Sequence, residues 1–178
     1  MSLHVAFLRG INLGKRQMKM AELKACLEEL GFSAVKTILA SGNVRFETED
    51  DKDLKGRLEK ALEDRFGFPV GVVLRSKAEV EAMLAANPFS GVHPDADVKR
   101  YILMFDRDLP ADLRLEGVPG DFDVLRIDRR DIYFLAHRLP NGRYGEGLDR
   151  IGKPLDEQVG KGRIETMRNW NTIEKALK

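Results

Sequence analysis

The spacing of apolar residues in the first part of the chain restricts its fold more than any other sequence feature. The segment 4–9 is mainly apolar on both of its alternating faces, which is typical of a strand buried on both sides. Apolar residues then recur at intervals of three and four, which lines one face of a helix, at Met20, Leu23, Leu27 and Leu30. The chain therefore has to combine strands with helices.

The two periods continue to alternate after the first helix. Residues 35–40 and 44–47 are predicted to be strands, and the turn-forming residues 41–43 join them into a hairpin. Apolar residues four apart predict a helix over 54–66, and alternating apolar residues predict a strand over 70–74. The resulting order, β-α-β-β-α-β, is that of a ferredoxin-like unit over residues 1–75.

The second part of the chain begins with a capping box, Ser76-Lys77-Ala78-Glu79, which opens a helix that Pro88 ends. The order of elements then starts again. Strands are predicted at 101–105, 122–127 and 132–136, a turn at 140–142, and short helices at 109–116, 147–151 and 172–177. We therefore expect an α+β protein with two tandem ferredoxin-like (βαββαβ-type) units, of which the second, residues 76–178, is less regular and starts with a linker helix.

Composition limits the classes of function. A formal net charge of +1 over 178 residues gives no overall attraction to nucleic acid or membrane, so any electrostatic steering has to be local. The single cysteine, Cys26, lies in a helical apolar pattern and is expected to be a core residue of a protein in a reducing compartment. No apolar run approaches the ~20 residues that span a bilayer, so the cytoplasm is the expected location.

The segment between the first strand and the first helix concentrates positive charge. No acidic residue precedes Glu22, and glycines punctuate the loop at Gly10 and Gly14. A strand that leads through glycines to a helix N-terminus presents free amides and a positive dipole end to an anion. The alternative is that the glycines only make a turn and that the cations are solvated. These cations are Arg9, Lys15, Arg16 and Lys19.

A second candidate segment lies near the C-terminus and holds the only tryptophan, Trp170. Asn171, with Glu174 three residues later, is predicted to cap the last helix, and Trp170 is predicted to fill the gap between the two domains, where it packs for its area. The functional alternative is that Trp170 stacks on a base or ring while Asn169 contacts polar edges.

Several segments together resemble the DUF1697 family, a group of mainly bacterial proteins without an assigned function. The resemblance covers nearly the whole chain and implies α+β, ferredoxin-like units, but no catalytic mechanism. Many members carry a second glycine where this chain has Lys15. The segments that carry the resemblance are Leu8-Arg9-Gly10-Ile11-Asn12-Leu13-Gly14, Lys19-Met20-Ala21-Glu22-Leu23, Leu30-Gly31-Phe32, Ser41-Gly42-Asn43-Val44 and Arg168-Asn169-Trp170-Asn171-Thr172.

Two further patterns have a structural interpretation that we favour. Ser41-Gly42-Asn43 is expected to be a turn with glycine at positive φ, although its hydroxyl and amide could also face a neighbouring loop. His93, Asp95 and Asp97 alternate and could converge on a metal, but an exposed linker is favoured. We therefore expect no metal site and no cofactor.

These observations lead to one working hypothesis. The chain is expected to bind a phosphate-bearing small molecule or a single-stranded nucleic acid where the early basic loop meets the tryptophan segment. Alternatives are an enzyme that acts on a phosphorylated or acyl small molecule in the same pocket, or a protein-interaction module; the sequence does not define the oligomeric state. The candidate ligand-binding residues are Arg9, Gly10, Asn12, Gly14, Lys15, Arg16, Lys19, Ser41, Asn43, Arg168, Asn169, Trp170 and Asn171.

Overall fold

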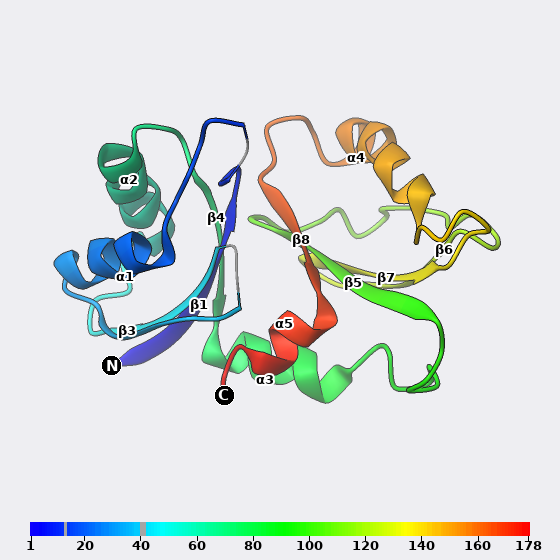
Figure 1. Cartoon of the computed structure of the whole chain (residues 1–178), viewed down its shortest axis with the longest axis horizontal. Coiled ribbons are helices and arrows are strands. Elements are labelled where there is room, and N and C mark those ends of the chain that lie inside the picture. The colour runs from blue at the N-terminus through cyan, green and yellow to red at the C-terminus, as the bar shows by residue number, and fades with distance from the viewer. Residues whose placement is uncertain (13, 40–41) are drawn as a thin grey trace. The chain divides into compact units, whose positions relative to one another are not determined.

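The computed structural model describes residues 1–12, 14–39 and 42–178 (Figure 1). The chain forms two compact units, one of Met1–Ala85 with Asn171–Lys178 and the other of Ala86–Trp170. Each unit contains a four-stranded antiparallel sheet, so the predicted α+β class is confirmed. A predicted domain boundary between residues 75 and 76 stays a prediction, because compactness does not measure independent folding.

The first unit has the predicted order of elements. Its sheet has the spatial order β2-β3-β1-β4, with β1 and β3 in the middle. One helix follows β1 and another follows β3, as the change of apolar spacing indicates. The elements are β1 (Ser2–Arg9), α1 (Met20–Glu29), β2 (Ser33–Thr37), β3 (Asn43–Thr48), α2 (Leu54–Phe66) and β4 (Gly71–Ser76).

Helices α1 and α2 lie on the same face of this sheet (Figure 1). Their apolar positions, spaced four apart, bury side chains against alternate residues of the strands. Cys26 is 4% exposed inside this cluster, and burial raises the pKa of its thiol, so its predicted role as a core residue is confirmed. The cluster includes Leu23 and Leu27 of α1, Leu58 and Leu62 of α2, and Ala6, Leu8, Val44 and Phe46 of the sheet.

The predicted capping box opens helix α3 (Lys77–Ala86). The backbone N–H of Glu79 donates to Ser76 Oγ at 3.1 Å, and that of Ser76 donates to Glu79 Oε1 at 3.0 Å. Two amides that the helix leaves without partners are thereby satisfied.

Replacing Ser76 by alanine is expected to lower the free energy of unfolding by about 1 kcal/mol, because the amide of Glu79 loses its acceptor. Urea unfolding followed by circular dichroism measures this change. Ser90→Ala is the control, since Ser90 is exposed and its replacement should stay within about 0.5 kcal/mol. Equal effects of the two substitutions would contradict the capping role.

The second sheet repeats the strand order of the first. Its spatial order is β6-β7-β5-β8, so the first and third strands of the unit are again central. The predicted hairpin between β6 and β7 is confirmed. The elements are β5 (Val98–Phe105), β6 (Phe122–Ile127), β7 (Asp131–His137), η1 (Glu146–Arg150), α4 (Gly152–Gln158) and β8 (Glu165–Asn169). The final helix, α5 (Trp170–Lys175), begins at the last residue of this unit and continues in the first unit.

One expectation for this part was wrong, a second was right only in part, and one strand was missed. Residues 109–116 form a turn and extended chain instead of a helix, because the amide of Leu109 donates to Arg129 O and the backbone of Arg114 bonds to Gln158. The predicted helix at 147–151 is a 3₁₀ turn that leads into α4. Strand β8 was not predicted at all.

Among the helices that the structure describes, none is both long enough and apolar enough to cross a lipid bilayer.

Candidate functional site

The basic loop between β1 and α1 has a left-handed backbone at Gly10 (φ 77°), Asn12 (φ 55°) and Gly14 (φ 56°). Glycine adopts this conformation without strain, and asparagine tolerates it better than most residues. The Asn12 side chain also closes the loop, since its Oδ1 accepts the backbone N–H of Met18 at 3.0 Å. Met18 is buried in the core of the unit, so the loop is anchored at both ends.

The cations of this loop are exposed at the surface of the first unit. The guanidinium of Arg16 lies 5.4 Å from the centre of the Phe68 ring, a cation–π distance, and its Nη1 is 3.4 Å from Gly10 O. Lys15 and Lys19 are exposed, as is Arg9 at the end of β1. Among the described residues, Lys15, Arg16 and Lys19 form no ion pair with a carboxylate.

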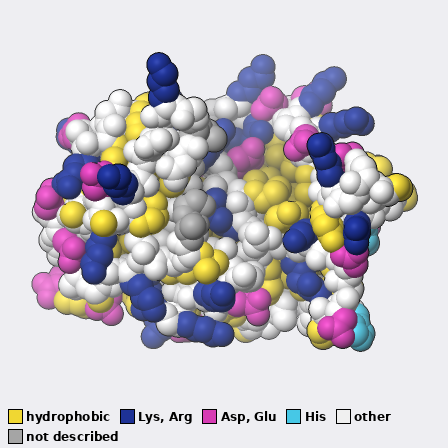
Figure 2. Space-filling model, in the orientation of Figure 1, with side chains coloured by type: hydrophobic (Ala, Val, Ile, Leu, Met, Phe, Trp, Pro, Cys, Tyr) yellow, Lys and Arg dark blue, Asp and Glu magenta, His cyan; other side chains and the backbone are white. Residues whose placement is uncertain are grey.

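The cations of helix α2 have a different environment. Lys60 pairs with Asp64 at 3.1 Å, and Arg65 reaches Glu29 on α1 at 2.9 Å. Figure 2 shows the same mixing more widely, with Lys and Arg side chains interspersed with Asp and Glu over the visible face. Lys15, Arg16 and Lys19 thus differ from these cations of α2 in having no carboxylate partner among the described residues.

The turn between β2 and β3 lies directly beside this loop. The backbone N–H of Leu8 donates to Gly42 O at 2.8 Å, and a Cβ placed on Gly42 would lie 2.7 Å from Ile11 Cδ1. Gly42 has φ 82°, so the predicted turn with glycine at positive φ is confirmed. Ser41 lies outside the described residues. Two of the predicted segments are therefore neighbours in space.

Asn43 has a mainly structural position in that turn. It is 2% exposed, and its Nδ2 donates to Ile38 O at 3.1 Å. Its own backbone oxygen accepts the N–H of Ile38 at 2.9 Å. These bonds close the turn. The side-chain amide of Asn43 therefore contributes to the candidate site by holding the backbone of this turn in place.

The C-terminal candidate residues Arg168, Asn169 and Trp170 belong to the second unit. Arg168 pairs with Ile102 across the sheet and donates from Nη1 to Thr166 Oγ1 and to Met167 O. Burial lowers the pKa of Arg168 to about 10, so its guanidinium still carries a charge at neutral pH. Asn169 is exposed at the end of β8.

The predicted burial of Trp170 is confirmed within this unit, whereas its predicted place in the gap between the two units stays a prediction. The indole is 5% exposed and lies 5.4 Å from the Phe89 ring and 5.9 Å from the Tyr133 ring, centre to centre. The cap predicted for the last helix was misplaced. Helix α5 begins at Trp170, and Asn171 is an exposed residue of its first turn. That Trp170 and its neighbours meet the basic loop stays a prediction, because the two segments belong to different units.

The side chains of His93 and Asp97 form hydrogen bonds with other groups of the protein. His93 Nδ1 accepts the backbone N–H of Asp95 at 3.0 Å, and the carboxylate of Asp97 bonds to Tyr144 and Arg138. The hydrogen bond that the Tyr144 hydroxyl donates to Asp97 is the main reason why the pKa of this carboxyl is lowered. In the part of the chain that the structure describes, no group of His, Cys, Asp and Glu side chains could hold a metal ion.

The sequence itself identifies the relatives of this chain. The model of the family described as "Protein of unknown function (DUF1697)" matches residues 1–133. The chain belongs to the DUF1697 family. This confirms the resemblance carried by the segments between Leu8 and Val44, whereas the segment Arg168–Thr172 lies outside the matched residues. No curated protein matches the sequence.

The fold of this DUF1697 protein is also found in a solved structure. A conserved bacterial protein of Streptococcus pneumoniae is 25% identical and superposes with a TM-score of 0.70. The match covers 99% of this chain and 96% of that one, so the similarity extends over both units.

Proposed function

We propose that this DUF1697 protein is a cytoplasmic binding protein whose basic loop, residues 9–19, holds a phosphate-bearing ligand. The observation that carries the proposal is the group of exposed cations, Lys15, Arg16 and Lys19, without a carboxylate partner among the described residues. We also propose that the chain consists of two ferredoxin-like units in tandem, since their sheets share one strand order.

The loop combines three sources of attraction for an anion. Lys15 and Lys19 supply point charges, and Arg16 offers a planar group that binds two oxygens of one phosphate. The positive end of the α1 dipole adds to them, and no side chain caps that helix start. Gly10 and Gly14, which both have a left-handed backbone, carry no Cβ that could obstruct a ligand.

Binding without chemistry is the function that these residues favour. General acid–base catalysis needs a titrating group within hydrogen-bond reach of the substrate. Residues 9–19 contain no carboxylate, histidine or thiol, so the loop has cations and amides but no proton acceptor of that kind. An enzyme would have to take such a group from another part of the chain.

The test is isothermal titration calorimetry of the full chain with pyrophosphate and a nucleoside triphosphate at about 0.1 M salt, at which exposed charges are only partly screened. Joint replacement of Lys15, Arg16 and Lys19 by alanine should weaken binding by roughly 30-fold, since three contacts of about 1 kcal/mol are reduced by screening. Arg9→Ala tests separately whether Arg9 takes part.

A matched variant controls for net charge. Joint replacement of Lys24, Lys60 and Lys77 by alanine removes the same charge from exposed positions of helices α1, α2 and α3. Affinity should stay within about threefold of the unmodified chain, because distant exposed charges are screened at this ionic strength. Equal losses in the two triple variants, or no binding by the unmodified chain, would refute the loop site.

A single-stranded oligonucleotide distinguishes the two classes of ligand. Binding through phosphates would weaken with salt, with a slope of about −0.7 per phosphate that the protein neutralises. A phosphate-bearing small molecule that binds more tightly than the oligonucleotide supports the small-molecule site; the reverse order supports nucleic acid.

A further inference from the structure

We propose that a pocket in the second unit binds a small apolar carboxylate, independently of the basic loop. The pocket has a volume of about 230 Å³ and lies between the extended segment that precedes β6 and the turn formed by η1 and α4. Its apolar wall consists of Leu115, Val118, Phe122, Ile151 and Pro154. Its charged residues are Arg114, Glu116, Asp121 and Arg150.

The two arginines of this pocket are exceptional in their unit. The guanidinium groups of other arginines there bond to protein groups: Arg107 to Asp106, Arg138 to Asp97, and Arg163 to Glu165. Among the described residues of the unit, Arg114 and Arg150 are the two arginines whose guanidinium groups make no such bond. Both line the same small, largely apolar pocket.

The two acidic residues of the pocket form no ion pair with these arginines among the described residues. The carboxylate of Asp121 accepts the backbone N–H of Gly147 through both of its oxygens, at 3.1 and 2.9 Å. That bond holds η1 against β6, where a Cβ on Gly147 would lie 2.8 Å from Asp121 Oδ2 and 3.0 Å from Phe122 Cε1. Glu116 is exposed and forms no ion pair among the described residues.

The backbone that carries one arginine is held in place before any ligand arrives. The N–H of Arg114 donates to Gln158 Oε1 at 2.9 Å, and Gln158 Nε2 donates back to Arg114 O at 2.8 Å. Arg150 is the last residue of η1, so its backbone belongs to a regular element. The backbone therefore loses little conformational entropy when a ligand binds, and this favours affinity.

These features define the chemical class of the ligand. A carboxylate can receive two parallel hydrogen bonds from a guanidinium, and a compact apolar body can replace water against the half-buried Leu115 and the exposed Val118. The pocket is smaller than the 300–1,000 Å³ that is usual for drug-sized ligands, so the ligand has to be small. Inorganic phosphate lacks the apolar body, and a neutral aromatic lacks the charge.

Benzoate is the probe, and its binding to the full chain can be followed by calorimetry and by amide chemical shifts in NMR. We expect millimolar or tighter affinity, with shifts centred on residues 114–122 and 147–154. Benzamide, which has nearly the same shape without the charge, should bind at least tenfold more weakly. No benzoate binding up to about 10 mM, or equal binding of benzamide, would overturn the proposal.

Variants locate the site. Joint replacement of Arg114 and Arg150 by glutamine should weaken benzoate binding at least tenfold, while Glu116→Gln should strengthen it about twofold by removing a repulsive charge. The control is Arg143→Gln, an exposed arginine of the same unit outside the pocket, which should leave the affinity unchanged. An unchanged affinity in the double variant refutes the site. The triple variant of Lys15, Arg16 and Lys19 should bind benzoate normally, so this proposal and the loop site can fail separately.

Discussion

Replacing Gly42 by alanine is expected to destabilise the first unit by about 2–3 kcal/mol and to weaken anion binding at the basic loop. Two costs combine at this position. A residue other than glycine at φ 82° costs roughly 1–2 kcal/mol. The new Cβ would also lie 2.7 Å from Ile11 Cδ1 and 3.3 Å from Leu8 Cβ, so the loop that carries the cations has to shift.

Gly67 provides a matched control for Gly42. It has nearly the same backbone conformation, with φ 80°, but a Cβ there would meet nothing within 4 Å. Gly67→Ala therefore isolates the backbone cost, which we expect to be about 1 kcal/mol with normal anion binding. Urea unfolding and calorimetry of both variants give the comparison. If the two substitutions destabilise the unit equally, the close contact between the turn and the loop does not exist.

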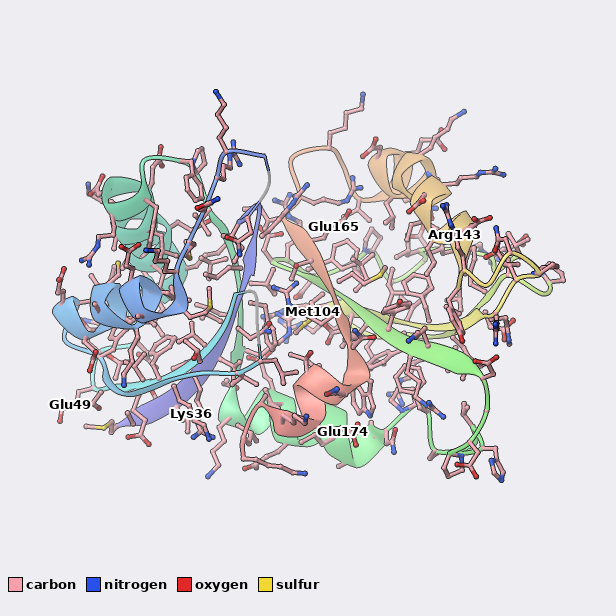
Figure 3. The ribbon with its side chains drawn as sticks, in the orientation of Figure 1. Lys36, Glu49, Met104, Arg143, Glu165 and Glu174 are labelled. Carbon is pink, nitrogen blue, oxygen red and sulfur yellow. The ribbon has the colours of Figure 1, made fainter. Side chains whose placement is uncertain are left out.

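Replacing Arg163 by alanine is expected to destabilise the second unit by about 3 kcal/mol. The Arg163 side chain is 7% exposed and bonds to Glu165 in bidentate fashion, at 2.9 and 3.2 Å. It also reaches Asp156 on α4 and Gly160 O, so it ties α4 to the start of β8. Removing it leaves the partly buried carboxylate of Glu165, labelled in Figure 3, without its partner.

The measurements are urea unfolding and hydrogen exchange at the amides of β8, which should become faster. Arg143, also labelled in Figure 3, is the control because its pair with Glu146 spans 3.6 Å and is exposed. Arg143→Ala should change the free energy of unfolding by less than about 1 kcal/mol. A small effect at Arg163, with unchanged exchange in β8, would contradict its role in holding that strand.

The first unit could be assigned from sequence because its signals are local. The spacing of Leu23 and Leu27 on α1, and of Leu58 and Leu62 on α2, marks the buried face of each helix whatever lies beside it. The capping box at Ser76 also acts within one turn of chain, and its two bonds are the predicted ones. The family motifs likewise lie in the sequence itself.

The candidate sites could be predicted only in part. The excess of positive charge in the basic loop is visible in the sequence, but the engagement of Asn12 with Met18 and of Asn43 with Ile38 is not. The pocket at Arg114 and Arg150 was missed, because these arginines have the same local sequence character as the paired arginines of the unit. Only the partners of each side chain distinguish them.

By itself, the sequence determined the order of elements in the first unit, the start of α3, the charge of the early loop and the family, since each depends on residues close together in the chain. Only the tertiary structure decided that Glu165–Asn169 is a strand, because it lacks apolar alternation and pairs with β5, far away in sequence. It also decided that residues 109–116 are not a helix, because Arg129 and Gln158 take up backbone groups that a helix would use.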